Sequence, residues 1–101
     1  MEAIGLLVTL EARSGKEADA EAFLKSARPL ALNEKGTMKW YAFKIGPAKF
    51  GIFDTFANEA GRNADLTGDI AKALGSRANE LFAVAPQVEK VELLASTPLK
   101  A

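Results

Sequence analysis

The order in which the hydrophobic periodicity changes along this chain is its most constraining feature. Six segments alternate between the period of a strand and that of a helix, in the order strand, helix, strand, strand, helix, strand. Their approximate ranges are residues 4–12, 14–33, 37–45, 50–56, 58–82 and 88–94. This order predicts an α+β fold of the ferredoxin-like βαββαβ type. We therefore expect a four-stranded antiparallel sheet with two helices on one face.

Local signals indicate where the helices begin and break. Ser14, followed by Glu17 three residues later, has the spacing of a capping box, so we expect the first helix to begin there. Pro29 lies inside the same helical segment and predicts a kink, because proline lacks a backbone donor. Asn58 is a residue type that favours the N-cap of the second helical segment. Two glycines weaken that segment, so we expect it to divide into two or three pieces.

The composition excludes several kinds of chemistry. The chain has 13 basic and 13 acidic residues, and a net charge of zero gives no attraction to polyphosphate, so we do not expect a general nucleic-acid binder. It has no cysteine and no histidine. A disulfide, a thiol nucleophile and a Ser-His-Asp triad are therefore impossible within this chain, and we expect no metal site.

The length of the chain and its N-terminal residues predict one domain without a membrane anchor. A chain of 101 residues provides one core, so we expect residues 1–101 to form a single domain with a tail from about residue 97. The first residues lack the basic start and long apolar run of a secretory signal. No stretch approaches the roughly 20 apolar residues of a membrane span. We therefore expect a cytoplasmic protein with no membrane partner.

The first strands are apolar on both faces, which predicts a partner for the sheet. In the first strand, Ile4, Leu6 and Val8 lie on one face, whereas Leu7 lies on the other. Two helices cover only one face of a four-stranded sheet. The other face needs a partner, and a second copy of the same sheet is the commonest solution, so we expect a homodimer.

Several segments together resemble a known family. They are residues 5–12 (GLLVTLEA), 14–17 (SGKE), 36–41 (GTMKWY) and 50–56 (FGIFDTF), the last followed by NEA at 58–60. In this order and spacing, over nearly the whole chain, they resemble the antibiotic biosynthesis monooxygenase family, one branch of the dimeric α+β barrels.

This resemblance implies a dimer whose two sheets form a barrel, with a cavity between each sheet and its own helices. Some family members oxygenate electron-rich aromatic substrates without a metal, flavin or nicotinamide, because the deprotonated substrate itself passes an electron to oxygen. The protein then supplies a shaped, dry cavity and a proton acceptor. A chain without histidine or cysteine is compatible with this mechanism, so we expect no cofactor.

The chain departs from the family's pattern at two positions. Phe56 stands where many members have a tryptophan at the end of the third strand, and Asp65 aligns with a histidine early in the second helix. The haem-degrading branch uses a proximal histidine in that region, so its absence argues against haem. Asp65 replaces such a base only if burial raises its pKa.

The candidate site residues are aromatic and polar. Trp40 and Tyr41 are adjacent on a strand, so one side chain should enter the cavity and the other the interface between sheets. The expected catalytic residues are Asp65 and Asn63. The expected substrate-binding residues, which would form the wall of the cavity or hold an anionic group, are Trp40, Tyr41, Phe43, Phe53, Phe56 and Arg77.

Each of these residues also has a purely structural interpretation. Aromatic side chains such as those at positions 40 and 41 dominate ordinary cores. Asp54 lies in an apolar strand, where it is either paired with a lysine or arginine or acts as an acceptor at the cavity mouth. Arg62, Asn63 and Asp65 would otherwise form a solvated helix face, and Arg77 would be an exposed surface residue.

Three functional hypotheses therefore remain open. The first is a cofactor-independent monooxygenase that acts on a small aromatic or quinol-like molecule. The second is a non-catalytic dimeric barrel that binds a small apolar molecule, and the third is a structural subunit without a ligand. The missing histidine favours the last two hypotheses, whereas the aromatic wall favours a ligand over none.

Overall fold

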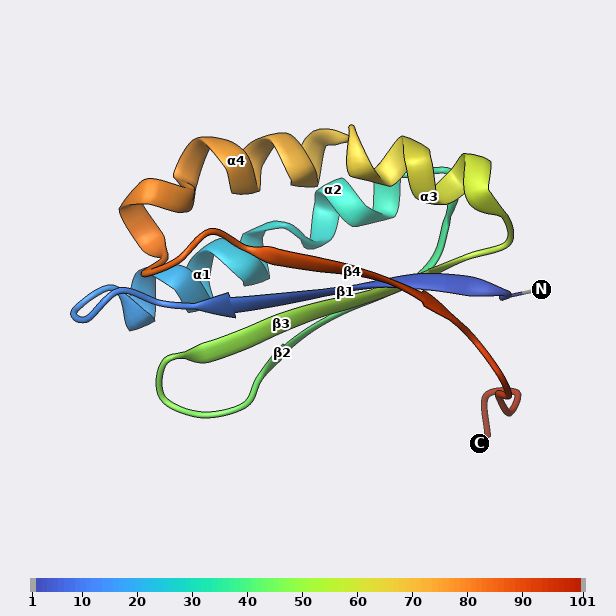
Figure 1. The fold of residues 1–101 in the computed structure, drawn as a ribbon, viewed down its shortest axis with the longest axis horizontal. Coiled ribbons are helices and arrows are strands. Elements are labelled where there is room, and N and C mark those ends of the chain that lie inside the picture. Colours follow the sequence, from blue (N-terminus) through green and yellow to red (C-terminus); the bar gives the residue numbers. More distant parts are fainter. Residues whose placement is uncertain (1, 101) are drawn as a thin grey trace.

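The sheet at the centre of the molecule confirms the predicted topology. The computed structural model describes residues 2–100 (Figure 1). Its elements, in chain order, are β1 (Ile4–Glu11), α1 (Glu17–Ser26), α2 (Arg28–Asn33), β2 (Thr37–Lys44), β3 (Lys49–Phe56), α3 (Glu59–Leu66), α4 (Asp69–Leu81) and β4 (Gln87–Glu92). The strands form one sheet in the order β2-β3-β1-β4, and every neighbouring pair is antiparallel. This is the ferredoxin-like arrangement expected from the βαββαβ order.

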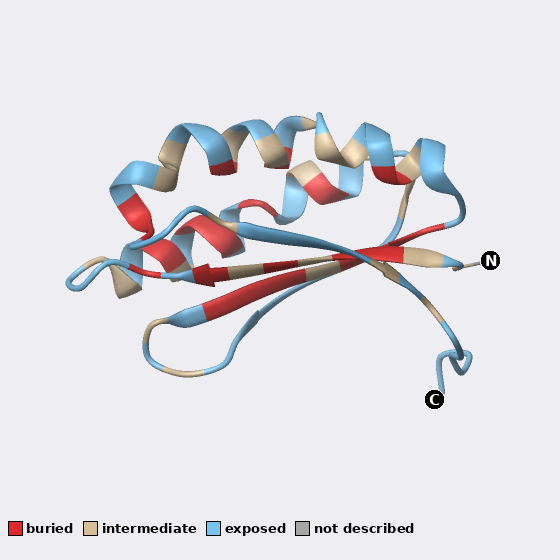
Figure 2. Cartoon of the chain, in the orientation of Figure 1, coloured by how far each residue is buried: buried red, intermediate tan, exposed pale blue. Residues whose placement is uncertain are grey.

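The helices cover one face of this sheet and leave the other open (Figure 1). The core lies between the covered face and the helices. There the inward side chains of β1 and β3 pack against side chains of α1, α2 and α4. Figure 2 shows that buried positions concentrate on β1, β3 and the inner sides of the helices. The edge strands β2 and β4 are largely exposed. The central strands therefore carry most of the burial that holds the fold together.

The two predicted helix breaks occur where the sequence places them. α1 ends at Ser26 and α2 begins at Arg28, with Pro29 in its first turn, where proline's missing N–H has no helical partner to lose. The second helical segment divides at Gly68 into α3 and α4. Gly75 does not interrupt α4, so the segment has two pieces.

One of the two predicted helix caps is confirmed and the other is wrong. The Asn58 side chain accepts a hydrogen bond of 3.0 Å from the Gly61 N–H and caps α3. At α1 the cap position is Lys16, and no side chain makes a capping bond. Gly15 adopts φ +85° in a preceding turn, so the helix begins later than a capping box at Ser14 requires.

The open face of the sheet carries partly exposed aromatic side chains. Tyr41 is 51% exposed and Phe43 is 36% exposed, and Phe53 pairs with Tyr41 across the strands. Leu7 of β1 pairs with Phe53 on the same face. Within residues 2–100, no helix has the length and apolar character needed to cross a membrane.

Candidate functional site

A small cavity lies between the covered face of the sheet and helices α3 and α4. Its volume is about 50 Å³. Most of its wall is apolar, and the polar exceptions are Trp40, Asp54 and Asp65. The apolar lining comes from Leu6, Val8, Ile52, Leu66, Ile70, Ala71, Leu74 and Val88. An apolar cavity with a few polar groups at one side is the usual character of a ligand site.

Strand register places two of the polar groups opposite each other. Trp40 of β2 pairs directly with Asp54 of β3, so both side chains point from the same face of the sheet. Asp65 comes from the last turns of α3, which Asn58 caps at its start. A fourth group, Glu34, follows α2, and its Oε2 accepts a 3.2 Å hydrogen bond from the Thr37 hydroxyl.

The three carboxyl groups of Glu34, Asp65 and Asp54 form a hydrogen-bonded series. Asp65 lies within hydrogen-bonding reach of both Glu34 and Asp54. Such contacts require protons on some of the three groups, because two ionised carboxylates have no donor to offer. The contact with Glu34 lowers the pKa of Asp65, and the contact with Asp65 lowers the pKa of Asp54. We call this series the carboxyl chain.

Burial raises the pKa of all three groups of the carboxyl chain and keeps a proton on Glu34 at neutral pH. Burial is the main cause that raises the pKa of Glu34 to about 8, with further contributions from the hydrogen bond and the charge of Asp65. Burial likewise raises the pKa of Asp54 to about 6 and that of Asp65 to about 6. Repulsion from Glu34 adds to the rise at Asp54. Acid groups that titrate near neutral pH are suited to proton transfer.

Apart from the contacts among the three carboxyl groups themselves, three buried polar atoms around the carboxyl chain have no hydrogen-bond partner among the described residues. They are Glu34 Oε1, Trp40 Nε1 and Asp54 Oδ1. Asp54 is only 3% exposed, so water at the surface does not satisfy its carboxylate. An unsatisfied buried group costs about 1–3 kcal/mol, so these atoms indicate a place where a ligand or an enclosed water belongs.

An open groove lies on the other side of Trp40. It has a volume of about 350 Å³ and runs between α2 and β2. Glu34 and Trp40 line it together with Arg28, Ala31, Leu32, Thr37, Met38 and Lys39. Trp40 therefore contributes to both the groove and the small cavity, and the carboxyl chain connects the two.

The structure brings only part of the predicted site together. Trp40 and Asp65 line the cavity as expected, whereas Asn63 is exposed on α3. Phe56 is completely buried but does not contact the cavity. The predicted structural alternative for Asp54, a pair with lysine or arginine, does not occur, because its neighbours are acidic.

Three of the predicted wall residues lie on the wrong face for this cavity. Tyr41, Phe43 and Phe53 project from the open face of the sheet, on the far side from Trp40. Phe43 packs over Gly51, where an added Cβ would lie 2.3 Å from its ring. Strict alternation along β2 and β3 is the reason, since neighbours of Trp40 and Asp54 must point away from the helices.

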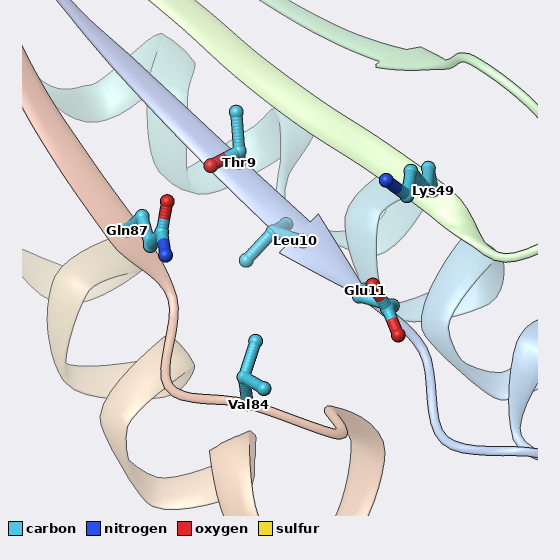
Figure 3. A pocket seen from close by; sticks show the side chains of 6 residues that line it. All are labelled: Thr9, Leu10, Glu11, Lys49, Val84 and Gln87. Carbon is cyan, nitrogen blue, oxygen red and sulfur yellow. The ribbon is translucent and has the colours of Figure 1, made fainter.

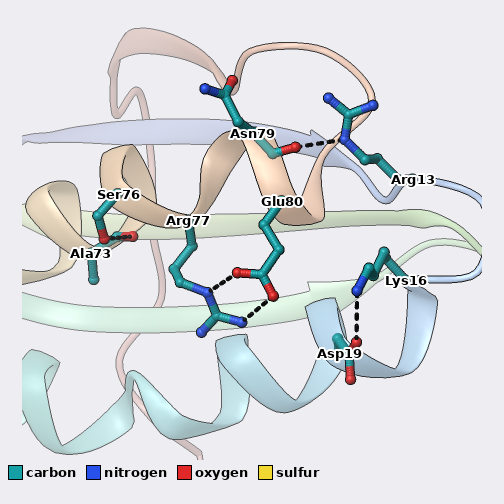
Figure 4. A network of polar contacts seen from close by, with 8 residues as sticks. All are labelled: Arg13, Lys16, Asp19, Ala73, Ser76, Arg77, Asn79 and Glu80. Atoms are coloured by element: carbon teal, nitrogen blue, oxygen red, sulfur yellow. Dashed lines mark hydrogen bonds and ion pairs between the residues drawn. The ribbon is translucent and has the colours of Figure 1, made fainter.

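Arg77 also lies away from the cavity, on the surface of α4. Figure 4 shows its guanidinium facing Glu80, with hydrogen bonds of 2.8 and 3.2 Å. Its guanidinium also stands 5.6 Å from the centroid of the Phe23 ring of α1. The structural interpretation expected an exposed surface residue; Arg77 is partly exposed, and these contacts also pack it between α4 and α1.

Arg62 differs from the predicted solvated face. It is 7% exposed, and its Nη1 donates bonds of 3.4 Å to the carbonyl oxygens of Gly5 and Val91. Its Nη2 pairs with Glu59 at 3.5 Å. Arg62 thus fastens α3 to the sheet close to Asp65, which is a structural role that helical periodicity alone did not indicate.

A further hollow of about 210 Å³ opens beside the start of β4 (Figure 3). Its rim combines Glu11 and Lys49 with Thr9, Leu10, Val84 and Gln87. It contains neither a titrating cluster nor an unsatisfied buried atom, so it is the weaker candidate. Within residues 2–100, no group of three acidic side chains has an arrangement that could hold a metal ion.

Comparison with solved structures supports the fold and identifies one relative of high sequence identity. No protein-family model and no curated protein matches the sequence. NE2512, a protein of unknown function from Nitrosomonas europaea, is 50% identical with a TM-score of 0.95, covering 100% of this chain and 98% of that chain. Rv0793 from Mycobacterium tuberculosis is 10% identical with a TM-score of 0.83, covering 95% of this chain and 99% of that one.

A third structure carries the name of the family that the sequence resembles. It is a provisionally named antibiotic biosynthesis monooxygenase from Caulobacter crescentus, 22% identical with a TM-score of 0.76, covering 93% of this chain and 92% of that chain. At this identity the likeness concerns the fold alone. The identity of 50% over nearly both full lengths places this chain in the same family as the NE2512 protein of unknown function, with a fold that antibiotic biosynthesis monooxygenase-like structures share.

Proposed function

We propose that the protein is a cofactor-independent monooxygenase that acts on a small aromatic or quinol-like molecule. The observation that supports this proposal is the carboxyl chain beside Trp40, which places acids of raised pKa between a groove and an apolar cavity. A phenol loses its proton only to a base of suitable strength, and Glu34, with a pKa of about 8, is a comparatively strong carboxylate base in its ionised form, whose population rises as the pH approaches 8.

The size of each space decides where a substrate would lie. A cavity that takes a benzene ring has about 150 Å³. The small cavity has about 50 Å³, which is enough for a water or a molecule of oxygen but not for a ring. The groove, with about 350 Å³, accommodates a ring against Trp40, with its hydroxyl near Glu34.

The chemistry that follows balances without a bound cofactor. Glu34 takes the phenol proton, and the electron-rich anion adds oxygen at a ring carbon to give a peroxide. Protonation of the distal peroxide oxygen, loss of the proton on the ring carbon and cleavage of the O–O bond leave a carbonyl on that carbon and release the distal oxygen as water. The substrate supplies the electrons, so the protein's task is to orient the ring and move protons.

The test is oxygen uptake with reduced polycyclic phenols and no added cofactor. We expect uptake by the wild type and a loss of roughly 10²-fold or more in Glu34→Gln, the size usual for a general base. Glu21→Gln is the matched control, because Glu21 is an acidic residue that pairs with lysines on the surface. No uptake by the wild type with any such phenol would reject the proposal.

A non-catalytic binding protein is the second candidate. The observation that favours it is the groove of about 350 Å³, where Ala31, Leu32, Met38 and Trp40 offer apolar surface to a small molecule. Native mass spectrometry of freshly purified protein distinguishes the two candidates when combined with the oxygen assay. A retained small molecule without turnover would favour the binding protein over the enzyme.

We further propose that two copies associate through the open faces of their sheets. The partly exposed Tyr41, Phe43 and Phe53 give this face an apolar centre that water alone would cover in a monomer. Tyr41→Glu should convert a dimer to a monomer in sedimentation velocity at micromolar concentration, while Leu32→Glu on α2 should not. A monomeric wild type would refute this assembly.

A further inference from the structure

The carboxyl chain has a feature that the proposed reaction does not yet use, namely its inner end. Glu34 opens onto the groove, but Asp54 is 3% exposed and lines the small cavity. Its Oδ1 is a buried acceptor without a partner, and the Nε1–H of the directly opposed Trp40 is a buried donor without a partner. If Glu34 only had to accept a proton from a substrate in the groove, the reaction would not need the buried carboxyl of Asp54.

The two unpartnered atoms call for one particular kind of occupant. A hydroxyl oxygen accepts one hydrogen bond and donates another, so a single hydroxyl satisfies both Trp40 Nε1 and Asp54 Oδ1. The space is about 50 Å³, and one water needs only about 10–15 Å³ measured in this way. Water is therefore the hydroxylic molecule that fits both the chemistry and the volume.

We propose that Glu34, Asp65 and Asp54 act as a proton store that ends on a water bound between Asp54 and Trp40 in the cavity. The proton store goes beyond the proposed oxygenase function, and its role in turnover rests on that function. When Glu34 accepts the phenol proton at the groove, its own proton passes to the ionised Asp65, which shares it with Asp54. The reverse movement returns that proton to the peroxide, the ring carbon loses its own proton, and the distal oxygen leaves as water, so the protein ends unchanged.

The charged groups around the three carboxyls are compatible with this exchange of protons. Arg28 of α2 and Lys39 of β2 line the groove beside Glu34, and α3 contributes Asp65. From α4, the backbone of Ile70 lies close enough to Glu34 to lower its pKa. Asp54 meets the other two acids, and the only group besides Asp65 that lowers its pKa is its own backbone N–H. The three groups therefore share protons rather than forming ion pairs.

Carboxyl carbon NMR between pH 4 and pH 9 tests the store without any substrate. In the wild type, Glu34 should titrate near pH 8 and the two aspartates near pH 6, with each curve affected by the others. In Asp65→Asn the Glu34 midpoint should fall by about one pH unit, because the groups interact by roughly that much. Glu21→Gln should leave all three curves in place.

The bound water has its own observable on the same samples. The Trp40 indole N–H signal should show a cross-peak to a long-lived water in the wild type and should move with the titration of Asp54. Trp40 is the one tryptophan of the chain, so the assignment is unambiguous. If Asp65→Asn does not fold, Glu34→Gln serves the same purpose, with the Asp65 midpoint as the readout.

The outcomes separate the store from the enzyme. A Glu34 midpoint that does not move in Asp65→Asn, or an indole N–H without a bound water, would overturn the store whatever the oxygen assay gives. Coupled titrations with a bound water, but no oxygen uptake with any phenol, would support the store and reject the oxygenase. Coupled titrations together with uptake support both.

Discussion

Replacing Asp54 with asparagine should make the protein's stability less dependent on pH. The pKa of Asp54 is raised from 3.8 to about 6 in the folded protein, mainly by burial. The folded state therefore binds more protons than the unfolded state between these values, and the wild type loses stability as the pH rises through them. Each pKa unit corresponds to about 1.4 kcal/mol, so the loss is about 3 kcal/mol, complete above about pH 6.

Asparagine cannot ionise, so the variant does not suffer this loss. Any cost of the amide that is independent of pH cancels when the two proteins are compared at two pH values. The free energy of unfolding of Asp54→Asn, relative to the wild type, should rise by about 2.4 kcal/mol between pH 4 and pH 7, because a small part of the total loss has already occurred at pH 4. The comparison needs no assumption about which protein is more stable at either pH.

Urea unfolding followed by circular dichroism at pH 4, 5, 6 and 7 measures this difference. Asp69→Asn is the control, because Asp69 is an exposed aspartate at the start of α4 and should show no comparable change. A difference between Asp54→Asn and the wild type that stays constant from pH 4 to pH 7 would refute the argument. It would mean that the buried carboxyl does not titrate in the folded protein over this range.

Three further predictions concern the fold. Phe56→Ala should lower the free energy of unfolding by about 3–5 kcal/mol in urea, because this ring is completely buried. Asn58→Ala should cost about 1 kcal/mol in the same assay, whereas Ser14→Ala should cost less than about 0.5 kcal/mol because Ser14 makes no cap. Gly51→Ala should cost about 1–3 kcal/mol and shift the ring NMR signals of Phe43, which lies 2.3 Å from the added carbon.

The order of the elements could be read from the sequence because it depends on local chemistry. Hydrophobic period distinguishes strand from helix over a few residues, and proline acts on its own turn. The break before Pro29 and the cap at Asn58 were therefore correct. The capping box at Ser14 was wrong because Gly15 adopts a left-handed conformation in a turn that precedes the helix. The helix therefore begins later than the motif predicts.

The candidate site could be predicted only in part. Alternation along β2 established that Trp40 and Tyr41 point to opposite faces, but not which face the helices would cover. Trp40 and Asp65 were correctly placed at a cavity, and the aromatic wall was not, because three of its members follow the other face. Glu34 carried no signal at all, since an acidic residue after a short helix is usually a surface group.

The sequence alone thus determined the type and order of the elements and the absence of cysteine and histidine chemistry. Tertiary structure decided which acids meet. Strand register set Asp54 opposite Trp40, and the packing of α3 on the sheet brought Asp65 between Asp54 and Glu34. The physical reason is that the raised pKa values come from burial and mutual proximity, which are properties of residues distant in sequence and made neighbours by the fold.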